Sequence, residues 1–424
     1  MKILIGADQY PEYFNGAASF TDRLARGLAR RGHRVTLIWP SADGAPRTYS
    51  EDGIDIHRLR SFYWPWSNGF RISDPRTSAR ATKAILDVVR PDIVHIQSHL
   101  LIGRQLAGAA VRAHYPLVAT NHFMPENVLD HAPFLGPVNA AASRWAWRDL
   151  GHVYGQADLI TAPTPRAVQL LDTAAGLTAE AISCGIDPDR FGQPDRTAPS
   201  NVIPTVLFVG RLETEKRIDE LLQAFARLPV SVPARLHIVG TGTQKHQLKT
   251  LADALGLSDR VTFAGRVDDA ELAAAYRGSD LFCMPGTAEL QSLATLEAMS
   301  AGKPVIAANA MALPHLVTEG SNGYLYDPGD TRALTGHLAA LLSRPALRRR
   351  MGHASPNHCR TALSRPHPGR LRSSLRRAPS PAHREAERSR RGKGSSAAEQ
   401  TDSPCRGDVA ECARAGRRLS GSRP

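Results

Sequence analysis

The feature that most constrains the fold is an alternation of short apolar runs with longer amphipathic segments, which occurs twice along the chain. The first series opens with an apolar strand at residues 2–7 and a helix at 17–31 that carries Phe20, Leu24 and Leu28 on one face. Such alternation favours a parallel sheet with helices on both faces. The remaining elements predicted in this series are strands at 34–39, 54–59, 92–97, 117–121 and 159–162, and helices at 75–90, 101–113 and 137–156.

The second series follows a stretch punctuated by Pro188, Pro194, Pro199 and Pro204, which is typical of an interdomain linker. Two doubly wound domains that face each other would form a cleft at the carboxyl ends of their strands. We therefore expect an α/β fold of two Rossmann-like domains, at residues 1–190 and 205–352, joined by a linker at 191–204. The second series predicts strands at 205–209, 235–239, 261–264 and 281–284, and helices at 218–228, 244–255 and 270–277.

Length and charge restrict the classes of function. A chain of 424 residues with 42% apolar side chains is long enough for two cores. Of its net charge of +13, +10 lies in the last 72 residues, which hold 16 Lys and Arg and 6 Asp and Glu. The rest of the chain is nearly balanced, which argues against a specific nucleic-acid partner.

Those last residues, 353–424, break the pattern. Apolar periodicity stops at about Met351, and the following segment is rich in Arg, Ser, Pro, Ala and Gly. This composition predicts disorder. It resembles out-of-frame translation of a GC-rich coding region more than an evolved regulatory tail, so we expect its removal after His353 to leave stability unchanged.

No cysteine forms a C-x-x-C pair, which indicates neither a metal site nor a disulfide framework among the five cysteines. The apolar run at the N-terminus is too short for a signal peptide. No segment approaches the ~18 apolar residues that a membrane span needs. These patterns predict a cytoplasmic protein and leave open peripheral contact with the inner face of the cell membrane.

Glu289 and Glu297 form the most informative chemical pattern, because they straddle the expected start of a helix at Ser292. The free N–H groups of a helix N-terminus suit a phosphate. A carboxylate at Glu297 can accept hydrogen bonds from a ribose diol, and Glu289 can reach a second polyol. Together these groups fit a nucleotide-sugar. The alternative is that both glutamates are solvated surface charges. The apolar residues around Glu297 argue against this alternative.

Other candidates lie at predicted strand ends. Arg211 and Lys216 follow the first strand of the second series and can neutralise a diphosphate. Gly16 would let backbone approach a phosphate from the other domain. The segment Gly265–Arg266 could meet a base, and His122 ends a strand at the same cleft edge. Taken singly, these residues have ordinary explanations as well: the Arg and Lys side chains as surface charges, the glycines as turn residues, and His122 as a histidine with no role in catalysis.

In combination, these motifs resemble glycosyltransferase family 4, a group of retaining enzymes with the GT-B fold. The resemblance covers about residues 1–345. A segment at Cys184-Gly-Ile-Asp187 looks like the family's Asn-Gly-Val-Asp, with two substitutions. The other matching motifs are Gly-Arg211-Leu-x-x-Glu-Lys216, Val-x-Phe263-x-Gly265, Glu289-x7-Glu297 and Asn322-Gly323-Tyr-Leu.

The resemblance implies roles for these residues. Arg211 and Lys216 would bind the diphosphate, and Glu297 would hold the ribose. Glu289 would contact and position the donor sugar. The donor would be a UDP- or GDP-linked hexose, used as co-substrate without a metal or another cofactor, since Arg, Lys and the helix dipole can absorb the leaving charge.

Further roles concern the sugar. Gly16 would close on the phosphate, and His122 would line the reaction centre. Gln291, Ser292 and Leu293 stand shortly after the first Glu, where the family usually has an aromatic-glycine pair. This difference preserves the expected nucleotide site and leaves the sugar open.

The acceptor is suggested by five aromatic residues within 62–70. Aromatic side chains in a loop suit a membrane interface or a lipid acceptor, and they equally suit packing against the sheet. We expect a lipid or glycolipid acceptor, with polysaccharide precursors and small alcohols as alternatives. A nucleotide-sugar epimerase of the same architecture is the competing function, which would need paired carboxylates at the sugar C2 and no acceptor.

Overall fold

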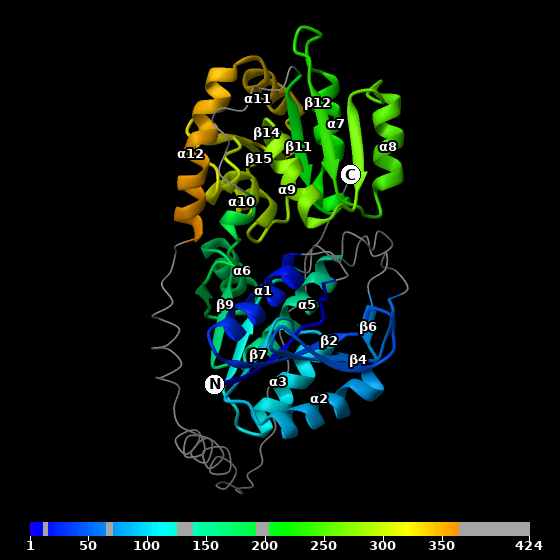
Figure 1. The fold of residues 1–424 in the computed structure, drawn as a ribbon, viewed down its shortest axis with the longest axis vertical. Coiled ribbons are helices and arrows are strands. Elements are labelled where there is room, and N and C mark those ends of the chain that lie inside the picture. Colours follow the sequence, from blue (N-terminus) through cyan, green and yellow to red (C-terminus); the bar gives the residue numbers. More distant parts are fainter. Residues whose placement is uncertain (12–15, 65–70, 125–138, 192–202, 364–424) are drawn as a thin grey trace, which may run out of the picture. The chain divides into compact units, whose positions relative to one another are not determined.

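The structure is a computed structural model that describes residues 1–11, 16–64, 71–124, 139–191 and 203–363 (Figure 1). The described residues form two large parallel sheets and one small hairpin. Both large sheets confirm the predicted α/β class with helices between successive strands. The predicted domain boundaries at residues 190 and 205 stay a prediction.

The first sheet has eight strands in the order β10-β9-β8-β7-β1-β2-β4-β3. Only β3 runs antiparallel to its neighbour, and this edge strand was not predicted. The strands are β1 (Lys2–Gly6), β2 (Arg34–Pro40), β3 (Arg47–Glu51), β4 (Ile54–Leu59), β7 (Ile93–Ile96), β8 (Leu117–Thr120), β9 (Leu159–Ala162) and β10 (Glu180–Ala181).

Helices cover both faces of this sheet. Helix α1 packs with Ile5 and Trp39 on one face, whereas α2 and α3 pack with Leu4 and Ile96 on the other (Figure 1). A small hairpin of β5 (Ser61–Tyr63) and β6 (Arg71–Ser73) leads into α2. The helices are α1 (Gly16–Arg30), α2 (Pro75–Val89), α3 (Leu101–Arg112), α5 (Asn139–Tyr154) and α6 (Pro165–Ala175).

The second sheet has six parallel strands in the order β13-β12-β11-β14-β15-β16. Strands β14 and β15 are buried along their whole length, as expected of a parallel sheet covered on both faces. The strands are β11 (Thr205–Val209), β12 (Arg235–Val239), β13 (Val261–Gly265), β14 (Leu281–Met284), β15 (Val305–Ala308) and β16 (Gly323–Tyr326). The helices are α7 (Ile218–Ala226), α8 (Lys245–Ala254), α9 (Asp269–Gly278), α10 (Leu293–Ser300), α11 (Thr331–Ser343) and α12 (Pro345–Leu363), with short 3-10 turns η2 (Pro188–Phe191), η3 (Thr214–Lys216) and η4 (Leu313–His315).

Both sheets follow the Rossmann strand order. The second sheet reads 3-2-1-4-5-6 in chain order, and the run β4-β2-β1-β7-β8-β9 of the first sheet reads the same way. In such sheets the order reverses beside the first strand, and ligands bind at the carboxyl ends of the strands there. The two reversal points lie between β1 and β7 and between β11 and β14.

The prediction of disorder from residue 353 was wrong for residues 353–363, which complete helix α12. Ser355 Oγ donates to the carbonyl of Lys303 at 2.7 Å, and Cys359 Sγ lies 3.5 Å from the carbonyl of Leu296. Ser355 and Cys359 are buried, although neither is a large apolar residue. Apolar periodicity missed the last turns of this helix because their buried residues, Ser355 and Cys359, have small side chains. Residues 364–424 of the predicted tail lie outside the described residues.

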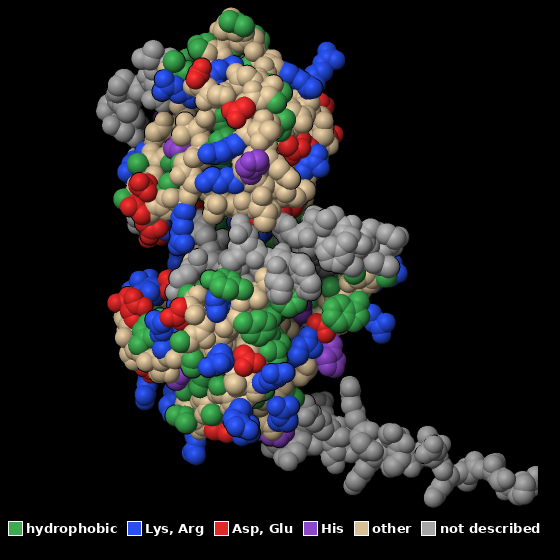
Figure 2. Space-filling model, turned by 90° about the vertical axis from the view of Figure 1, so that its right-hand side faces the viewer, with side chains coloured by type: hydrophobic (Ala, Val, Ile, Leu, Met, Phe, Trp, Pro, Cys, Tyr) green, Lys and Arg blue, Asp and Glu red, His purple; other side chains and the backbone are tan. Residues whose placement is uncertain are grey.

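The surface agrees with the balanced charge of the chain before residue 353. The face drawn in Figure 2 shows Lys and Arg side chains interspersed with Asp and Glu rather than gathered into one stripe. Among the described residues, no helix combines the length and the apolar character required to cross a bilayer.

Candidate functional site

The carboxyl edge of the second sheet brings together two of the predicted site residues. Lys216 ends the turn η3 after β11, and Glu289 lies in the loop between β14 and α10. Their side chains form an ion pair between Lys216 Nζ and Glu289 Oε1, with 14% and 10% of their surfaces exposed. This edge is the reversal point of the sheet, so the pair lies where a ligand is expected.

Arg211 is anchored beside this pair by a neighbouring acid. Its Nη2 donates to Glu215 Oε1 at 2.8 Å. The Glu215 side chain is 1% exposed, whereas that of Arg211 is 27% exposed. A guanidinium has five N–H donors in a fixed plane, so one bond to Glu215 orients the group and leaves other donors for an anion.

Helix α10 begins after Ser292, as the sequence predicted. Ser292 has a left-handed backbone with φ 63°, and its side chain makes no capping bond to the helix. The Ser292 hydroxyl instead contacts Thr295 Oγ1 at 2.8 Å. The first N–H groups of α10 are therefore not capped by this side chain, which suits the phosphate site expected at its N-terminus.

Glu297 lies half-buried on α10 and accepts a hydrogen bond from the Tyr276 hydroxyl at 2.9 Å. Burial raises the pKa of Glu297 to about 6, although the Tyr276 bond and the charges of Arg23 and Arg190 act in the opposite direction. Asp269 raises the pKa further. The carboxylate is therefore ionised at neutral pH and close enough to its pKa to be sensitive to its surroundings.

The segment predicted to meet a base borders a pocket. Strand β13 ends at Gly265, whose φ of 73° favours glycine. The next residue, Arg266, is exposed, and it lines a pocket of about 560 Å³ together with Val267, Asp268 and Asp269. Another pocket, of about 370 Å³ near Glu213 and Arg217, is lined by none of the predicted site residues.

His122 follows β8 at the carboxyl edge of the first sheet. Its Nε2 lies 2.9 Å from Gln97 Oε1, and its Nδ1 lies 3.9 Å from Cys184 Sγ. The amide oxygen can only accept, so Nε2 carries the proton in this arrangement and Nδ1 is the acceptor that faces Cys184 Sγ. Burial, together with nearby His95, lowers the pKa of His122 to about 3, and the imidazole is neutral.

Gly16 and Leu293 lie close together. Gly16 begins α1, and a methyl group added to it would lie 3.3 Å from Leu293 Cδ1. Gln291 is committed to the protein, since its Oε1 accepts from the Cys184 N–H at 2.9 Å and its Nε2 donates to Ser183 Oγ at 2.5 Å. Gln291, Ser292 and Leu293 as donor-binding residues stay a prediction.

Sequence reasoning missed several residues of this region. Gln97, which bonds His122, directly follows β7 next to a reversal point, and the strand-end rule would have found it. Tyr276 lies inside helix α9 and gave no comparable signal. Among the described residues, no cluster of three or more His, Cys, Asp or Glu side chains is suited to holding a metal ion.

Comparison with known proteins matches two family models in order along the chain. The model described as "Glycosyltransferase Family 4" matches residues 14–190, and "Glycosyl transferases group 1" matches residues 195–358. A GDP-mannose-dependent alpha-mannosyltransferase of Mycolicibacterium smegmatis is 30% identical, over 84% of this chain and 92% of that protein. A phosphatidyl-myo-inositol mannosyltransferase of Mycobacterium leprae is 32% identical, over 79% of this chain and 86% of that protein.

The fold has solved relatives too. The sucrose-phosphate synthase of Thermosynechococcus elongatus superposes with a TM-score of 0.72 at 22% identity, covering 89% of this chain and all of the other. These matches are glycosyltransferases and give no support to the epimerase alternative. The two sheets are the Rossmann-like domains of a GT-B enzyme, which uses nucleotide-sugar donors, and the chain belongs to glycosyltransferase family 4.

Proposed function

We propose that this chain transfers a hexose from a UDP- or GDP-linked donor, with retention of configuration, to a lipid or glycolipid at the inner face of the cell membrane. The observation that carries the donor half of this proposal is the Lys216–Glu289 ion pair at the reversal point of the second sheet. It joins a cation suited to a diphosphate with a carboxylate suited to sugar hydroxyls.

Donor binding would separate that pair. The diphosphate would draw Lys216 and the guanidinium of Arg211, because it carries two negative charges and can accept charge-assisted hydrogen bonds from both cations at once. Glu289 would then be free to accept hydrogen bonds from the sugar. Two cations and the N-terminus of α10 together can neutralise the leaving diphosphate, so we expect transfer without a metal ion and without loss in the presence of EDTA.

Glu297 would hold the ribose, and the pocket beside Arg266 would take the base. His122 would line the reaction centre from the first sheet. As a neutral imidazole it can exchange hydrogen bonds with sugar hydroxyls without placing a charge beside the donor. For a retaining enzyme of this family, the leaving phosphate oxygen would take the proton of the acceptor hydroxyl.

The acceptor half rests on the hairpin of β5 and β6. Phe62, Tyr63 and Trp64 of this hairpin are 42%, 62% and 41% exposed. They are the aromatic residues of the 62–70 segment that the structure describes, and they project from a first-sheet region with exposed Arg60 and Arg76 nearby in sequence. Aromatic side chains beside arginines suit the headgroup region of an anionic membrane.

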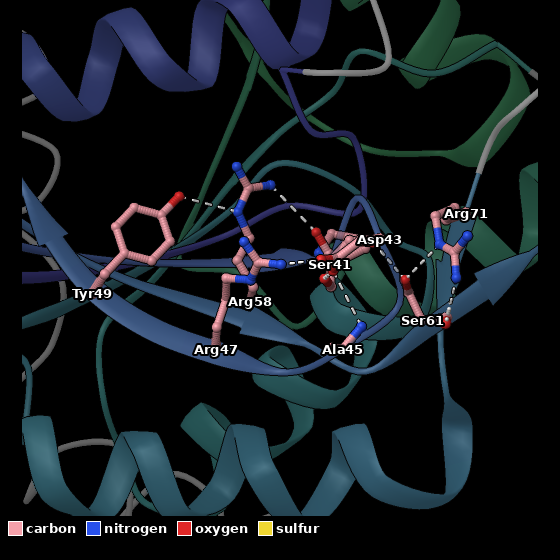
Figure 3. Close-up of polar contacts among 9 residues, drawn as sticks. Ser41, Asp43, Ala45, Arg47, Tyr49, Arg58, Ser61 and Arg71 are labelled. Carbon is pink, nitrogen blue, oxygen red and sulfur yellow. Dashed lines mark hydrogen bonds and ion pairs between the residues drawn. The ribbon is translucent and has the colours of Figure 1, made fainter.

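The hairpin is held by a polar cluster (Figure 3). Arg71 Nε and Nη2 donate to the side chain and the carbonyl of Ser61, both at 3.0 Å. The Arg71 guanidinium also lies 4.1 Å from the centre of the Tyr63 ring. Ser61 Oγ in turn bonds the carbonyl of Ser41 at 2.5 Å. This fastening fixes the exposed aromatic residues relative to the sheet, as a preformed membrane contact requires.

The names of the relatives support the choice of candidates. GDP-mannose is the first donor to test and phosphatidylinositol the first acceptor, because similar proteins are named for them. A thermal-shift screen with GDP-mannose, UDP-glucose and ADP-glucose would show which nucleotide raises the melting temperature. The preferred radiolabelled donor is then incubated with vesicles of phosphatidylcholine and phosphatidylinositol.

Label in the lipid fraction is the expected result. Phe62→Ser with Tyr63→Ser should reduce transfer to vesicles and leave donor binding unchanged. The control is Val88→Ser, which replaces another exposed apolar side chain, on α2, by serine. The proposal of a lipid acceptor would be overturned if free hexose were released and no lipid were labelled, with any lipid and in any buffer.

A further inference from the structure

Glu297, whose carboxylate is expected to bind the ribose, accepts a hydrogen bond from a tyrosine hydroxyl. The hydroxyl of Tyr276 lies 2.9 Å from Glu297 Oε2 and 3.2 Å from the carbonyl of Ala294. Both acceptors belong to helix α10, one turn apart, whereas Tyr276 lies on helix α9. The hydroxyl has one proton, and the nearer, charged Glu297 Oε2 is the better acceptor, so this bond links the carboxylate on α10 to helix α9 and leaves Glu297 Oε1 outside it.

The Tyr276 ring is rigidly placed. Its side chain is fully buried, and it lies edge-on to Phe191 with a centroid distance of 5.2 Å. On another side it lies 6.1 Å from the ring of Phe282. An enclosed aromatic ring cannot follow a moving partner, so its hydroxyl defines where Glu297 Oε2 must be.

We propose that Tyr276 is a positioning residue for donor binding, whose hydroxyl orients Glu297 toward the ribose diol. This inference rests on the proposed role of Glu297 and names the residue on which that role depends. Burial raises the pKa of the Tyr276 phenol well above its usual value, so it remains a donor at every working pH.

Burial and four neighbouring side chains determine the pKa of Glu297. Asp269 on α9 opposes its ionisation, whereas Arg190 of η2 and Arg23 of α1 favour it, and burial raises its pKa to about 6. The Tyr276 bond favours the ionised form. A hydrogen bond to a charged group is equivalent to about one to two pH units of pKa, so its loss would bring the titration of Glu297 to about neutrality.

The experiment is calorimetric titration of GDP-mannose and of UDP-glucose into the protein between pH 5 and 9. A nucleotide-sugar is used because its diphosphate diester does not titrate in this range. For the wild type, affinity should fall as the pH falls through about 6, since protonated Glu297 loses an acceptor. For Tyr276→Phe, the midpoint should rise by about one to two units, with affinity about two- to tenfold weaker at pH 7 and a smaller loss at pH 9, where only the lost orientation of Glu297 remains.

Two variants separate positioning from packing. Phe282→Leu loosens the same cluster but keeps the hydroxyl, so its midpoint should stay at that of the wild type. Glu297→Gln should bind weakly with no step near pH 6. An equal loss of affinity at all pH values in Tyr276→Phe, with an unmoved midpoint, would overturn the inference.

Should Tyr276→Phe not fold, 3-fluorotyrosine at position 276 gives a second measurement. This side chain is nearly isosteric and a stronger hydrogen-bond donor, so the midpoint should move downward. An unchanged or raised midpoint contradicts the inference. Failure of the proposed function has a different signature, because the wild type would then bind neither nucleotide-sugar at any pH.

Discussion

The carboxyl edges of the two sheets share one topology and differ in chemistry. At the first edge, His122 contacts the uncharged side chain of Gln97, burial lowers the pKa values of His95 and His99 to about 4, and burial raises the pKa of the Asp8 carboxyl group, which is held by Ser98. At the second edge, the contacts are ion pairs, Lys216 with Glu289 and Arg211 with Glu215. Equal strand order therefore fixes where a site lies, and the side chains at the strand ends decide what it binds.

The difference suits the two halves of a transfer reaction. A diphosphate needs cations, and in the proposed function Lys216 and Arg211 at the second edge would supply them. Hydroxyl groups need donors and acceptors without charge, which neutral imidazoles and amides provide.

The largest effect is expected from acid. His95, His99 and His122 are neutral in the fold, with pKa values depressed from 6.5 to about 3–4. Stability from these groups is complete above pH 6.5 and is lost as the pH falls from 6.5 toward 4, because the unfolded chain takes up the protons. Between pH 6.5 and 5 each should cost about 1–2 kcal/mol.

All five tryptophans lie between Trp39 and Trp147, so their fluorescence reports the first sheet and its helices. Urea unfolding followed by this fluorescence should shift to lower urea at pH 5, relative to pH 7.5. His99→Gln should reduce the shift, and exposed His246→Gln should not. An identical midpoint at both pH values would contradict the neutral-edge description.

The next effect concerns the cationic edge. Lys216→Ala removes a charge-assisted bond to the diphosphate, worth about 1.5–3 kcal/mol, and should weaken nucleotide-sugar binding about 10- to 100-fold. Lys249→Ala, an exposed lysine of the same half, is the matched control. Calorimetry that gives wild-type affinity for Lys216→Ala would remove the diphosphate role.

A smaller and more selective effect is expected at the two glutamates. Glu297→Gln should weaken binding of the nucleoside diphosphate and binding of the nucleotide-sugar to a similar extent. Glu289→Gln should depress turnover and leave binding of the nucleoside diphosphate unchanged or slightly tighter, because Lys216 loses its internal partner. Equal losses of diphosphate affinity in both variants would show that the carboxylates do not divide nucleotide from sugar.

The smallest effect is expected at the C-terminal end of the described chain. A chain ended after Leu363 should keep the melting temperature and nucleotide affinity of the full chain. A chain ended after His353 loses the bond from Ser355 and the burial of Cys359 against α10, and should melt several degrees lower. Differential scanning calorimetry distinguishes the two, and equal melting of both would show that residues 354–363 add nothing.

The sequence predicted much of the fold and identified several neighbouring residues of the site. Strands such as β11 and β14 are continuous apolar runs, so their places and the two-sheet class could be predicted. The start of α10 after Ser292 could be predicted from the pattern around the two glutamates.

Contacts between distant segments could not be predicted. Lys216 and Glu289 were both expected to bind the donor, but their ion pair joins positions 73 residues apart. Tyr276 reaches Glu297 across two helices, and no spacing rule connects them. The end of α12 was missed for a different reason, since its buried face gives no hydrophobic signal.

That face has a consequence for sequence change. A methyl group added to Gly352 would lie 2.4 Å from the carbonyl of Gly302, and Ser355 and Cys359 continue the same close contact along α12. At these three positions, the volume of a new side chain should matter more than its polarity.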